Sequence, residues 1–200
     1  YNKQKMKKNY ENPMALRSKK MLTDSFFELL RENPQKKIKI SNICRHAGLA
    51  RPTFYSHFER VEDIPYEYLA GWQQELPEWF EKHISEEMSD EEKLQKISVV
   101  IIEHWSEHIE TYILLKEAGL EWIVYKVMKK ENEHLIHAVF SMSDLVPDPD
   151  LRDFVTAQIA LTFQNVFSFW VSMDMKYSPK ELSKTAMNIM SKIFAPDMPE

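Results

Sequence analysis

The chain has 200 residues, enough for one domain of ordinary size or for a small domain joined to a larger one. Glycine occurs only 3 times while 44% of residues are hydrophobic and 28% are charged, which favours an all-α fold over an α/β or β-sandwich fold. The net charge of −5 hides an asymmetry: residues 1–60 hold 14 Lys and Arg against 5 Asp and Glu, and residues 61–200 hold 12 against 26. A basic N-terminal third suggests that this end meets a polyanion, although an ordinary solvated basic face is the alternative.

The single cysteine, Cys44, excludes an internal disulfide and is typical of a reducing compartment. A buried thiol is a better interpretation than a nucleophile, because Cys44 lies between Ile43 and Arg45 in a short helical segment. No stretch reaches about 18 uninterrupted apolar residues, and the Lys-rich N-terminus has no apolar leader core. We therefore expect a cytoplasmic protein that does not associate with membranes.

The first residues, 1–12, are polar and basic without periodicity, which predicts a mobile arm. A helical row of apolar residues then runs from Pro13, which suits a first-turn position, to Asn33, and Pro34 ends it. This pattern predicts a first helix of about five turns.

Two short helices are expected next. Ile40, Ile43 and Ala47 fall at i, i+3 and i+7, and Gly48 supplies the turn that ends this helix. A second short helix restarts at once, with Pro52 in its first turn, where the missing N–H costs nothing. Two helices separated by a few residues around a glycine form a helix-turn-helix, although such pairs also arise by coincidence in all-α proteins.

The stretch "GLARPTFYSHFERVEDI", residues 48–64, interleaves aromatic and polar side chains. Phe54 and Phe58 form an i, i+4 row that can be buried, which turns the polar members toward solvent. The polar members that this row exposes are Arg51, Thr53, Tyr55, Ser56, His57 and Arg60. They offer a row of hydrogen-bond donors to a molecule outside the chain.

Residues 61–80 have a helical pattern interrupted by Pro65, which sets the start of a regular helix near residues 62–64, and by Pro77, which kinks or breaks it. We interpret this segment as a connecting helix between the basic and the acidic parts. Residues 81–200 are expected to form long helices.

Two capping boxes mark helix starts in the acidic part, one at Ser89 with Glu92 and one at Ser178 with Glu181. Between them, helices are predicted around Tyr112 to Glu117 with a stop near Gly119, from about Leu120 to Phe140, and from Leu151 to about Tyr177.

The helix predicted from Leu151 to Tyr177 is apolar nearly all round, which indicates burial on both sides. A monomer of 200 residues has difficulty burying both this helix and the apolar stripe of the last one, so we expect the two to pair with their copies as a four-helix bundle in a homodimer. A central helix of a monomeric bundle is the alternative. The candidate interface residues are Phe169, Trp170, Met173, Leu182, Ile189 and Ile193.

Specific sequence matches support a family assignment. The matches are the segments "AGL" at 47–49, "TFYSHF" at 53–58 and "EDI" at 62–64, preceded by Ile38, Ile40 and Ile43. Together they resemble the DNA-binding domain of the TetR/AcrR family of bacterial transcriptional regulators. The resemblance covers about Leu16 to Leu69, and the remaining residues match only in architecture. It implies an N-terminal helix-turn-helix domain at 13–60, a connecting helix at 61–80, and an effector-binding and dimerisation domain at 81–200.

The resemblance also implies that the third helix enters the DNA major groove. Ala50, Arg51 and Pro52 would then face base edges, and Thr53, Tyr55 and His57 would hold phosphates. Further contacts are expected from Ser56 and from backbone N–H groups at Ser41 or Asn42. Val61 stands where the family usually has a Lys, and the neighbouring Arg60 is expected to take over its phosphate contact. Ala50 and Pro52 also depart from the family pattern, so the motif lacks a usual capping side chain and some base-reading capacity.

Aromatic and histidine side chains of the acidic part are candidates for an effector pocket by the same resemblance. The candidates are His104, Trp105, His108, Tyr112, Trp122, Tyr125, Phe140, Phe163 and Phe167, with plain core packing as the alternative for each aromatic residue. The pairs His104 with His108 and His134 with His137 have spacings that suit metal ligands, but no third ligand can be placed, so structural histidines are favoured and no metal or cofactor is expected.

No phosphate loop, nucleophile elbow, carboxylate pair or zinc motif is present, which argues against catalysis. The sequence predicts a dimeric one-component regulator, a repressor released from a near-palindromic double-stranded operator by a small hydrophobic or aromatic effector. One alternative is a protein-interaction or coactivator module of the same fold that does not read DNA, motivated by Ala50, Pro52 and Val61. A metal-dependent enzyme using the histidine pairs is the weakest alternative.

Overall fold

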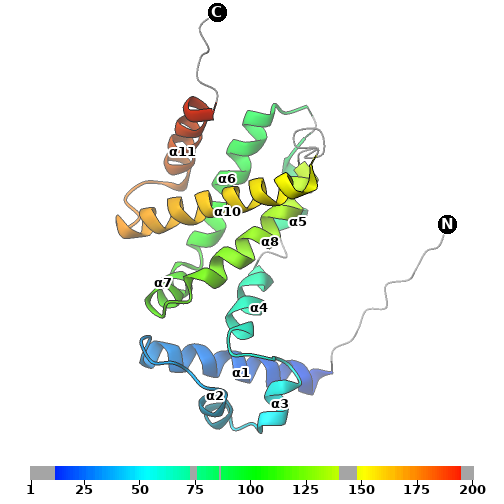
Figure 1. Cartoon of the computed structure of the whole chain (residues 1–200), viewed down its shortest axis with the longest axis vertical. Coiled ribbons are helices and arrows are strands. Elements are labelled where there is room, and N and C mark those ends of the chain that lie inside the picture. The colour runs from blue at the N-terminus through cyan, green and yellow to red at the C-terminus, as the bar shows by residue number, and fades with distance from the viewer. Residues whose placement is uncertain (1–11, 73–75, 86, 140–147, 195–200) are drawn as a thin grey trace, which may run out of the picture. The chain divides into compact units, whose positions relative to one another are not determined.

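The computed structural model describes residues 12–72, 76–85, 87–139 and 148–194, and every regular element in these ranges is helical (Figure 1). The chain divides into two compact units, the N-terminal unit Tyr1–Tyr68 and the C-terminal unit Leu69–Glu200. The helices are α1 (Pro13–Glu32), α2 (Ile40–Ala47), α3 (Arg51–Tyr55), α4 (Asp63–Trp72), α5 (Leu76–His83), α6 (Asp90–Ser106), α7 (Ile109–Glu117), α8 (Glu121–Val139), α10 (Pro149–Ser172) and α11 (Pro179–Phe194). The all-α prediction is confirmed.

The N-terminal unit is built on α1, which packs against α2 and α3. Its core is apolar and aromatic, with Leu22, Phe26, Ile43 and Phe54 at most 1% exposed. Burial of such side chains stabilises a fold by about 1.5–3 kcal/mol each. The side-chain oxygen of Asn12 accepts from the Met14 N–H at 3.0 Å and caps α1, which begins at Pro13 and ends at Glu32, as predicted to within one residue.

The C-terminal unit pairs α8 with α10 and α6 with α11. Figure 1 shows α10 crossing α8 within this unit. The core again lies between the helices, with Trp105, Tyr112, Leu115 and Ile123 at most 1% exposed. These four residues come from three helices, so the core joins α6, α7 and α8.

Both predicted capping boxes are present. The Glu92 N–H donates to Ser89 Oγ at 3.3 Å and the Ser89 N–H donates to Glu92 Oε2 at 2.9 Å, at the start of α6. The same reciprocal pair joins Ser178 and Glu181 at the start of α11. Each box satisfies two backbone N–H groups that a helix start would otherwise leave unpaired.

The helix expected from Leu151 to Tyr177 ends earlier, at Ser172. The backbone then enters the left-handed region, with φ of 51° at Asp174 and 53° at Met175. The Met175 N–H donates to the Trp170 carbonyl at 3.0 Å, and the Trp170 indole N–H donates to the Tyr177 carbonyl at 2.8 Å. These bonds fold the chain back on the end of α10, so the sequence-based prediction of a longer helix was wrong.

Only one side of α10 is buried within the protomer. Leu151, Phe154, Leu161 and Phe169 are between 39% and 60% exposed along the other side. By length and composition, Leu151–Ser172 is also apolar enough to span a membrane, with 22% of the qualifying window buried. Apolar helices of soluble assemblies satisfy the same criterion, so this property is weak evidence for a membrane span.

Candidate nucleic-acid interface

The turn between α2 and α3 is fixed by backbone hydrogen bonds around Gly48. Gly48 adopts φ 67° and its N–H donates to the Arg45 carbonyl at 3.3 Å, while the Leu49 N–H donates to the Cys44 carbonyl at 2.9 Å. This pair of bonds is the Schellman arrangement, which needs a residue in the left-handed region. Glycine adopts that conformation without steric cost, so Gly48 sets the direction in which α3 leaves α2.

Helix α3 is short and has no side-chain cap. Ala50 occupies the N-cap position with ψ 152°, and no side-chain hydrogen bond is made there, as its methyl group requires. Phe54 and Phe58 are 0% and 3% exposed, and their ring centroids lie 5.8 Å apart. The predicted apolar row is therefore buried, and it holds α3 on the N-terminal unit in place of the missing cap.

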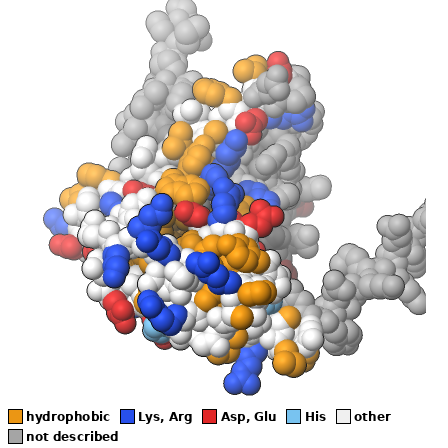
Figure 2. Space-filling view, turned by 60° about the horizontal axis from the view of Figure 1, so that its bottom comes forward, with side chains coloured by type: hydrophobic (Ala, Val, Ile, Leu, Met, Phe, Trp, Pro, Cys, Tyr) orange, Lys and Arg blue, Asp and Glu red, His pale blue; other side chains and the backbone are white. Residues whose placement is uncertain are grey.

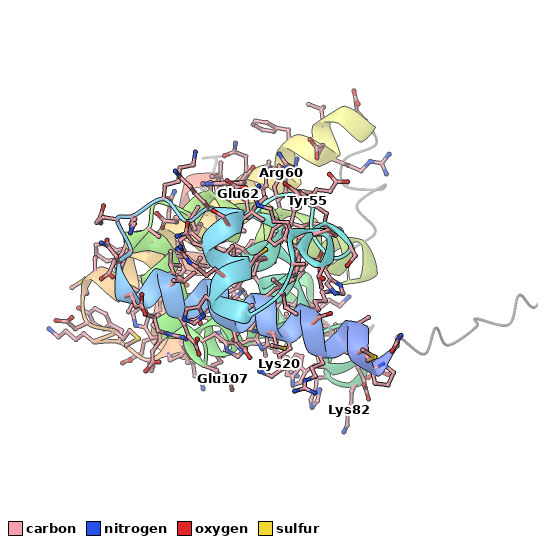
Figure 3. All side chains as sticks on the ribbon, turned by 90° about the horizontal axis from the view of Figure 1, so that it is seen from below. Lys20, Tyr55, Arg60, Glu62, Lys82 and Glu107 are labelled. Atoms are coloured by element: carbon pink, nitrogen blue, oxygen red, sulfur yellow. The ribbon has the colours of Figure 1, made fainter. Side chains whose placement is uncertain are left out.

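Four of the six polar residues of this segment lie on its outer side. Arg51, Ser56 and Arg60 are exposed, Tyr55 is 58% exposed, and Thr53 and His57 are half-buried. Figure 3 shows Tyr55, Arg60 and Glu62 beside one another, with Lys20 on the other side of α1. An outward row of hydroxyl, guanidinium and imidazole groups is suited to an extended anion such as a phosphate backbone.

Two side-chain contacts hold the segment that follows α3. The Asp63 carboxylate accepts from the N–H groups of Glu59 and Arg60 at 3.0 and 2.8 Å. His57 Nε2 lies 2.7 Å from Ser18 Oγ on α1, a contact across 39 residues. These contacts fix the backbone on which Arg60 and His57 are carried.

The backbone N–H groups of Ser41 and Asn42, at the start of α2, are the two candidates for a phosphate contact, and they differ in whether they already have a partner. The Asn42 N–H already donates to the Lys39 carbonyl at 2.9 Å. The Ser41 N–H belongs to the first turn, where a helix provides no acceptor, and its residue is exposed. Ser41 is therefore the better placed of the two for a phosphate.

Four exposed basic residues next to this surface were not selected by the motif analysis. They are Lys36, Lys37 and Lys39 in the segment before α2, and Arg45 on α2. Figure 2 shows Lys and Arg side chains scattered among white and hydrophobic surface on the side that it displays. The run "KKIK" at 36–39 was the available signal, because basic residues flanking a helix-turn-helix add phosphate contacts.

The candidate effector residues divide by burial. Trp105, Tyr112 and Phe167 are at most 2% exposed and pack edge to face, with the Tyr112 and Phe167 centroids 4.9 Å apart. Trp122 is 43% exposed beneath the Lys126 ammonium at 4.8 Å, and Phe140 lies outside the described residues. The remaining candidates, His104, His108, Tyr125 and Phe163, are half-buried.

Polar bonds join three helices of the C-terminal unit beside this aromatic cluster. The Tyr112 hydroxyl donates to Glu121 Oε1 at 2.6 Å, and Lys116 Nζ donates to Ser168 Oγ at 2.6 Å. Burial, followed by the bond to Glu121, raises the pKa of Tyr112 above its ordinary range, so the phenol stays protonated. The sequence analysis missed Lys116, Glu121 and Ser168, because their pairing depends on how α7, α8 and α10 meet.

The histidine pair on α6 packs with aromatic rings. His104 and His108 have centroids 5.6 Å apart, and His108 stacks on Trp72 at 3.9 Å. Among the described residues, no group of three or more His, Cys, Asp or Glu is placed to hold a metal. The side chains of His134 and His137 lie outside the described set.

The candidate dimer residues differ in how far their side chains are exposed on the protomer. Phe169 is 60% exposed on α10, whereas Trp170 is 4% exposed and packs against Phe167 at 5.7 Å. Met173 and Leu182 are half-buried. The side chains of Ile189 and Ile193, and residues 1–11 of the basic arm, lie outside the described residues.

Comparison with known proteins gives a consistent picture. No protein-family model matches the chain. A fatty acid metabolism regulator protein of Bacillus subtilis (strain 168) is 24% identical over 181 residues, covering 84% of this chain and 91% of that protein. Two solved structures share the fold. The fatty acid degradation regulator FadR from Bacillus halodurans has a TM-score of 0.58 and 16% identity, and the match covers 95% of this chain and 99% of that chain. A TetR transcriptional regulator from Streptococcus agalactiae 2603V has a TM-score of 0.57 and 21% identity, and the match covers 88% of this chain and 94% of that chain. The chain is therefore similar over most of its length to bacterial transcriptional regulators, and it shares the all-helical fold of a TetR transcriptional regulator.

Proposed function

We propose that the protein is a dimeric one-component transcriptional repressor that binds double-stranded DNA through α3 and leaves it when a small apolar effector binds the C-terminal unit. The observation that carries this proposal is the outward polar row on α3 and on the segment that follows it, whose inner side is packed through Phe54 and Phe58. Such a regulator acts in the cytoplasm, needs no cofactor and is not an enzyme.

DNA contact divides between base edges and phosphates. Arg51, at the start of α3, is the side chain able to bond a guanine bidentately. Tyr55, Ser56 and Arg60 are exposed beside it and supply donors to phosphate oxygens. Lys36 to Lys39 extend the basic surface, which makes binding sensitive to salt.

The unburied side of α10 supports the proposed dimer. Phe154 and Phe169 are 58% and 60% exposed on a helix whose other side packs against α8. A second copy that covers this side gives a two-fold assembly, which places two α3 helices in successive major grooves about 34 Å apart on a near-palindromic operator.

The effector is proposed to carry a long apolar chain. The Bacillus subtilis relative is named a fatty acid metabolism regulator, and the C-terminal unit here combines an aromatic cluster with a few part-buried polar groups, the composition of an apolar ligand site. Binding in this unit acts on DNA affinity by favouring one position of α4 over another, which requires only a difference in effector affinity between the two states.

The proposal is tested by fluorescence anisotropy with a labelled duplex from upstream of the protein's own gene, titrated against salt. Saturable binding that survives unlabelled random DNA and weakens in Tyr55→Ala supports a sequence-reading regulator. Tyr177→Ala is the matched control, because it removes an exposed tyrosine side chain from the other unit. Long-chain fatty acids and their thioesters are then added, and release of the duplex supports the effector assignment.

Binding that is weak, indifferent to sequence and equal in both variants would contradict the proposal. It would favour the alternative of a protein-interaction module of the same fold, for which the uncapped α3 is the supporting observation.

A further inference from the structure

We propose that Trp72, the last residue of α4, is the positioning residue through which the C-terminal unit and DNA binding influence each other, by its stacking on His108. This inference rests on the proposed function and names the contact by which an effector would act on α4. The contacts that carry it join the end of α4 to the junction between α6 and α7, all within the C-terminal unit.

Helix α4 is held by ring contacts at both ends. The boundary between the two compact units falls within this helix, after Tyr68. In the N-terminal unit, the Tyr68 ring centroid lies 4.6 Å from that of Phe27 on α1. At the other end, the Trp72 ring stacks on His108 with centroids 3.9 Å apart and planes inclined by 14°. A shift of His108 is therefore passed to a helix that also packs on α1.

His108 links this stack to the start of α7. Its carbonyl accepts from the N–H groups of Thr111 and Tyr112 at 3.1 and 3.2 Å, so its backbone opens α7. Its side chain makes no capping hydrogen bond, and the imidazole lies against Trp72 instead. Any movement of the first turn of α7, which includes Tyr112, consequently moves the ring on which Trp72 stacks.

A second set of contacts reaches Trp72 from the aromatic cluster. Trp105 on α6 meets the Trp72 ring at 5.8 Å and the Phe167 ring at 6.3 Å, both edge to face. Phe167 packs in turn on Tyr112 at 4.9 Å. Trp105, Phe167 and Tyr112 are at most 2% exposed, so an effector that enters among them displaces side chains that touch one another. Contiguous packing of this kind can carry energetic coupling between two sites.

Coupling between two binding events is reciprocal. If a change in the C-terminal unit alters DNA affinity through Trp72, DNA binding alters the C-terminal unit through the same residue and by the same factor. Typical factors are about 5- to 150-fold. The role of Trp72 can therefore be tested with DNA alone, without a known effector.

The test is hydrogen exchange of the full-length chain, free and saturated with the duplex described above, read by mass spectrometry of peptides from residues 104–118. In the wild type, DNA binding is expected to change exchange in this segment by about fivefold or more. Trp72→Leu keeps an apolar side chain but removes the stack, so the variant is expected to bind DNA without this response. His108→Ala removes the other ring without removing a capping bond and is expected to behave likewise.

Trp79→Leu is the matched control. Trp79 stacks on His83 with centroids 4.3 Å apart and planes inclined by 11°, but both residues belong to α5, so this pair joins no two helices. The control should respond to DNA as the wild type does. His108→Phe restores a flat ring and should recover the response that His108→Ala loses.

A merely structural role for Trp72 would lower the melting temperature and leave the response to DNA in place, which would overturn the inference. If Trp72→Leu does not fold, the two His108 variants decide by themselves. Loss of the response in Trp79→Leu as well would also overturn the inference, because it would show a general loosening of the unit.

A wild type that binds the duplex with no change in residues 104–118 would overturn the inference and leave the proposed function standing. Absence of DNA binding by the wild type would remove both.

Discussion

Replacing Phe169 by alanine tests how the protein associates. Phe169 is 60% exposed on α10, in line with Leu151, Phe154 and Leu161 on the side that turns away from α8. If two copies cover this side, Phe169→Ala removes apolar contact at two symmetry-related positions. The fold of the protomer should be little affected, because changes at exposed positions usually alter stability by about 0.5 kcal/mol or less.

The size of the effect follows from the exposed area. A Phe buries about 200 Å² when fully covered, so its exposed share here is roughly 120 Å². Alanine would retain about half of that area, and the loss of roughly 60 Å² costs about 1.5 kcal/mol per protomer at ~25 cal/mol per Å². Two copies give about 3 kcal/mol, which weakens dimerisation roughly 100-fold.

Sedimentation equilibrium over a wide concentration range measures this shift. Met14→Ala serves as the control, since Met14 is 79% exposed but lies on α1 in the other unit, and it should leave the dimer dissociation constant unchanged. Equal dissociation constants for Phe169→Ala and the wild type would show that this side of α10 stays uncovered on association, and the reasoning would be refuted.

Three further outcomes are expected. Arg60→Ala should reduce the slope of log affinity against log salt by about 0.9 for each phosphate that the guanidinium no longer neutralises, as a salt titration of DNA binding would reveal; an unchanged slope would remove Arg60 from the interface. Bonds from the Ser178 side chain and backbone lower the pKa of Glu181, so the capping contribution is present at neutral pH and disappears as the pH falls through the depressed folded-state pKa. Accordingly Ser178→Ala should lower the melting temperature at pH 7 and have less effect at pH 3, whereas equal shifts would argue against the cap. Tyr112→Phe leaves the part-buried Glu121 carboxylate without its 2.6 Å donor and should cost about 1–3 kcal/mol in chemical denaturation; a neutral result would mean that water replaces the hydroxyl.

Several features of the fold were predictable because their causes are local. Gly48 ends α2 through a backbone conformation that glycine adopts freely, and the two serine–glutamate capping boxes start α6 and α11 within three residues of sequence. The i, i+4 spacing of Phe54 and Phe58 was enough to assign the buried and the outward sides of the α3 segment. Such signals involve neighbours along the chain, so no tertiary information is needed to recognise them.

Other features depend on residues that the sequence keeps far apart. The early end of α10 follows from the Trp170 indole reaching the Tyr177 carbonyl, and nothing in the composition of residues 151–177 predicts where that bond forms. The hydroxyls of Ser98 and Ser183 bond to each other between α6 and α11, both buried, although neither residue stands out in the sequence.

Short-range periodicity and capping were therefore enough to establish the helical class, the helix-turn-helix with its outward polar row, and the capped starts of the long helices. The packing of Trp105, Tyr112 and Phe167 into the core, and the meeting of the Ser18 hydroxyl with the His57 ring, became visible only in three dimensions. Burial and hydrogen-bond pairing are set by how helices meet, and the pattern of a single helix leaves the partner on its apolar side unspecified.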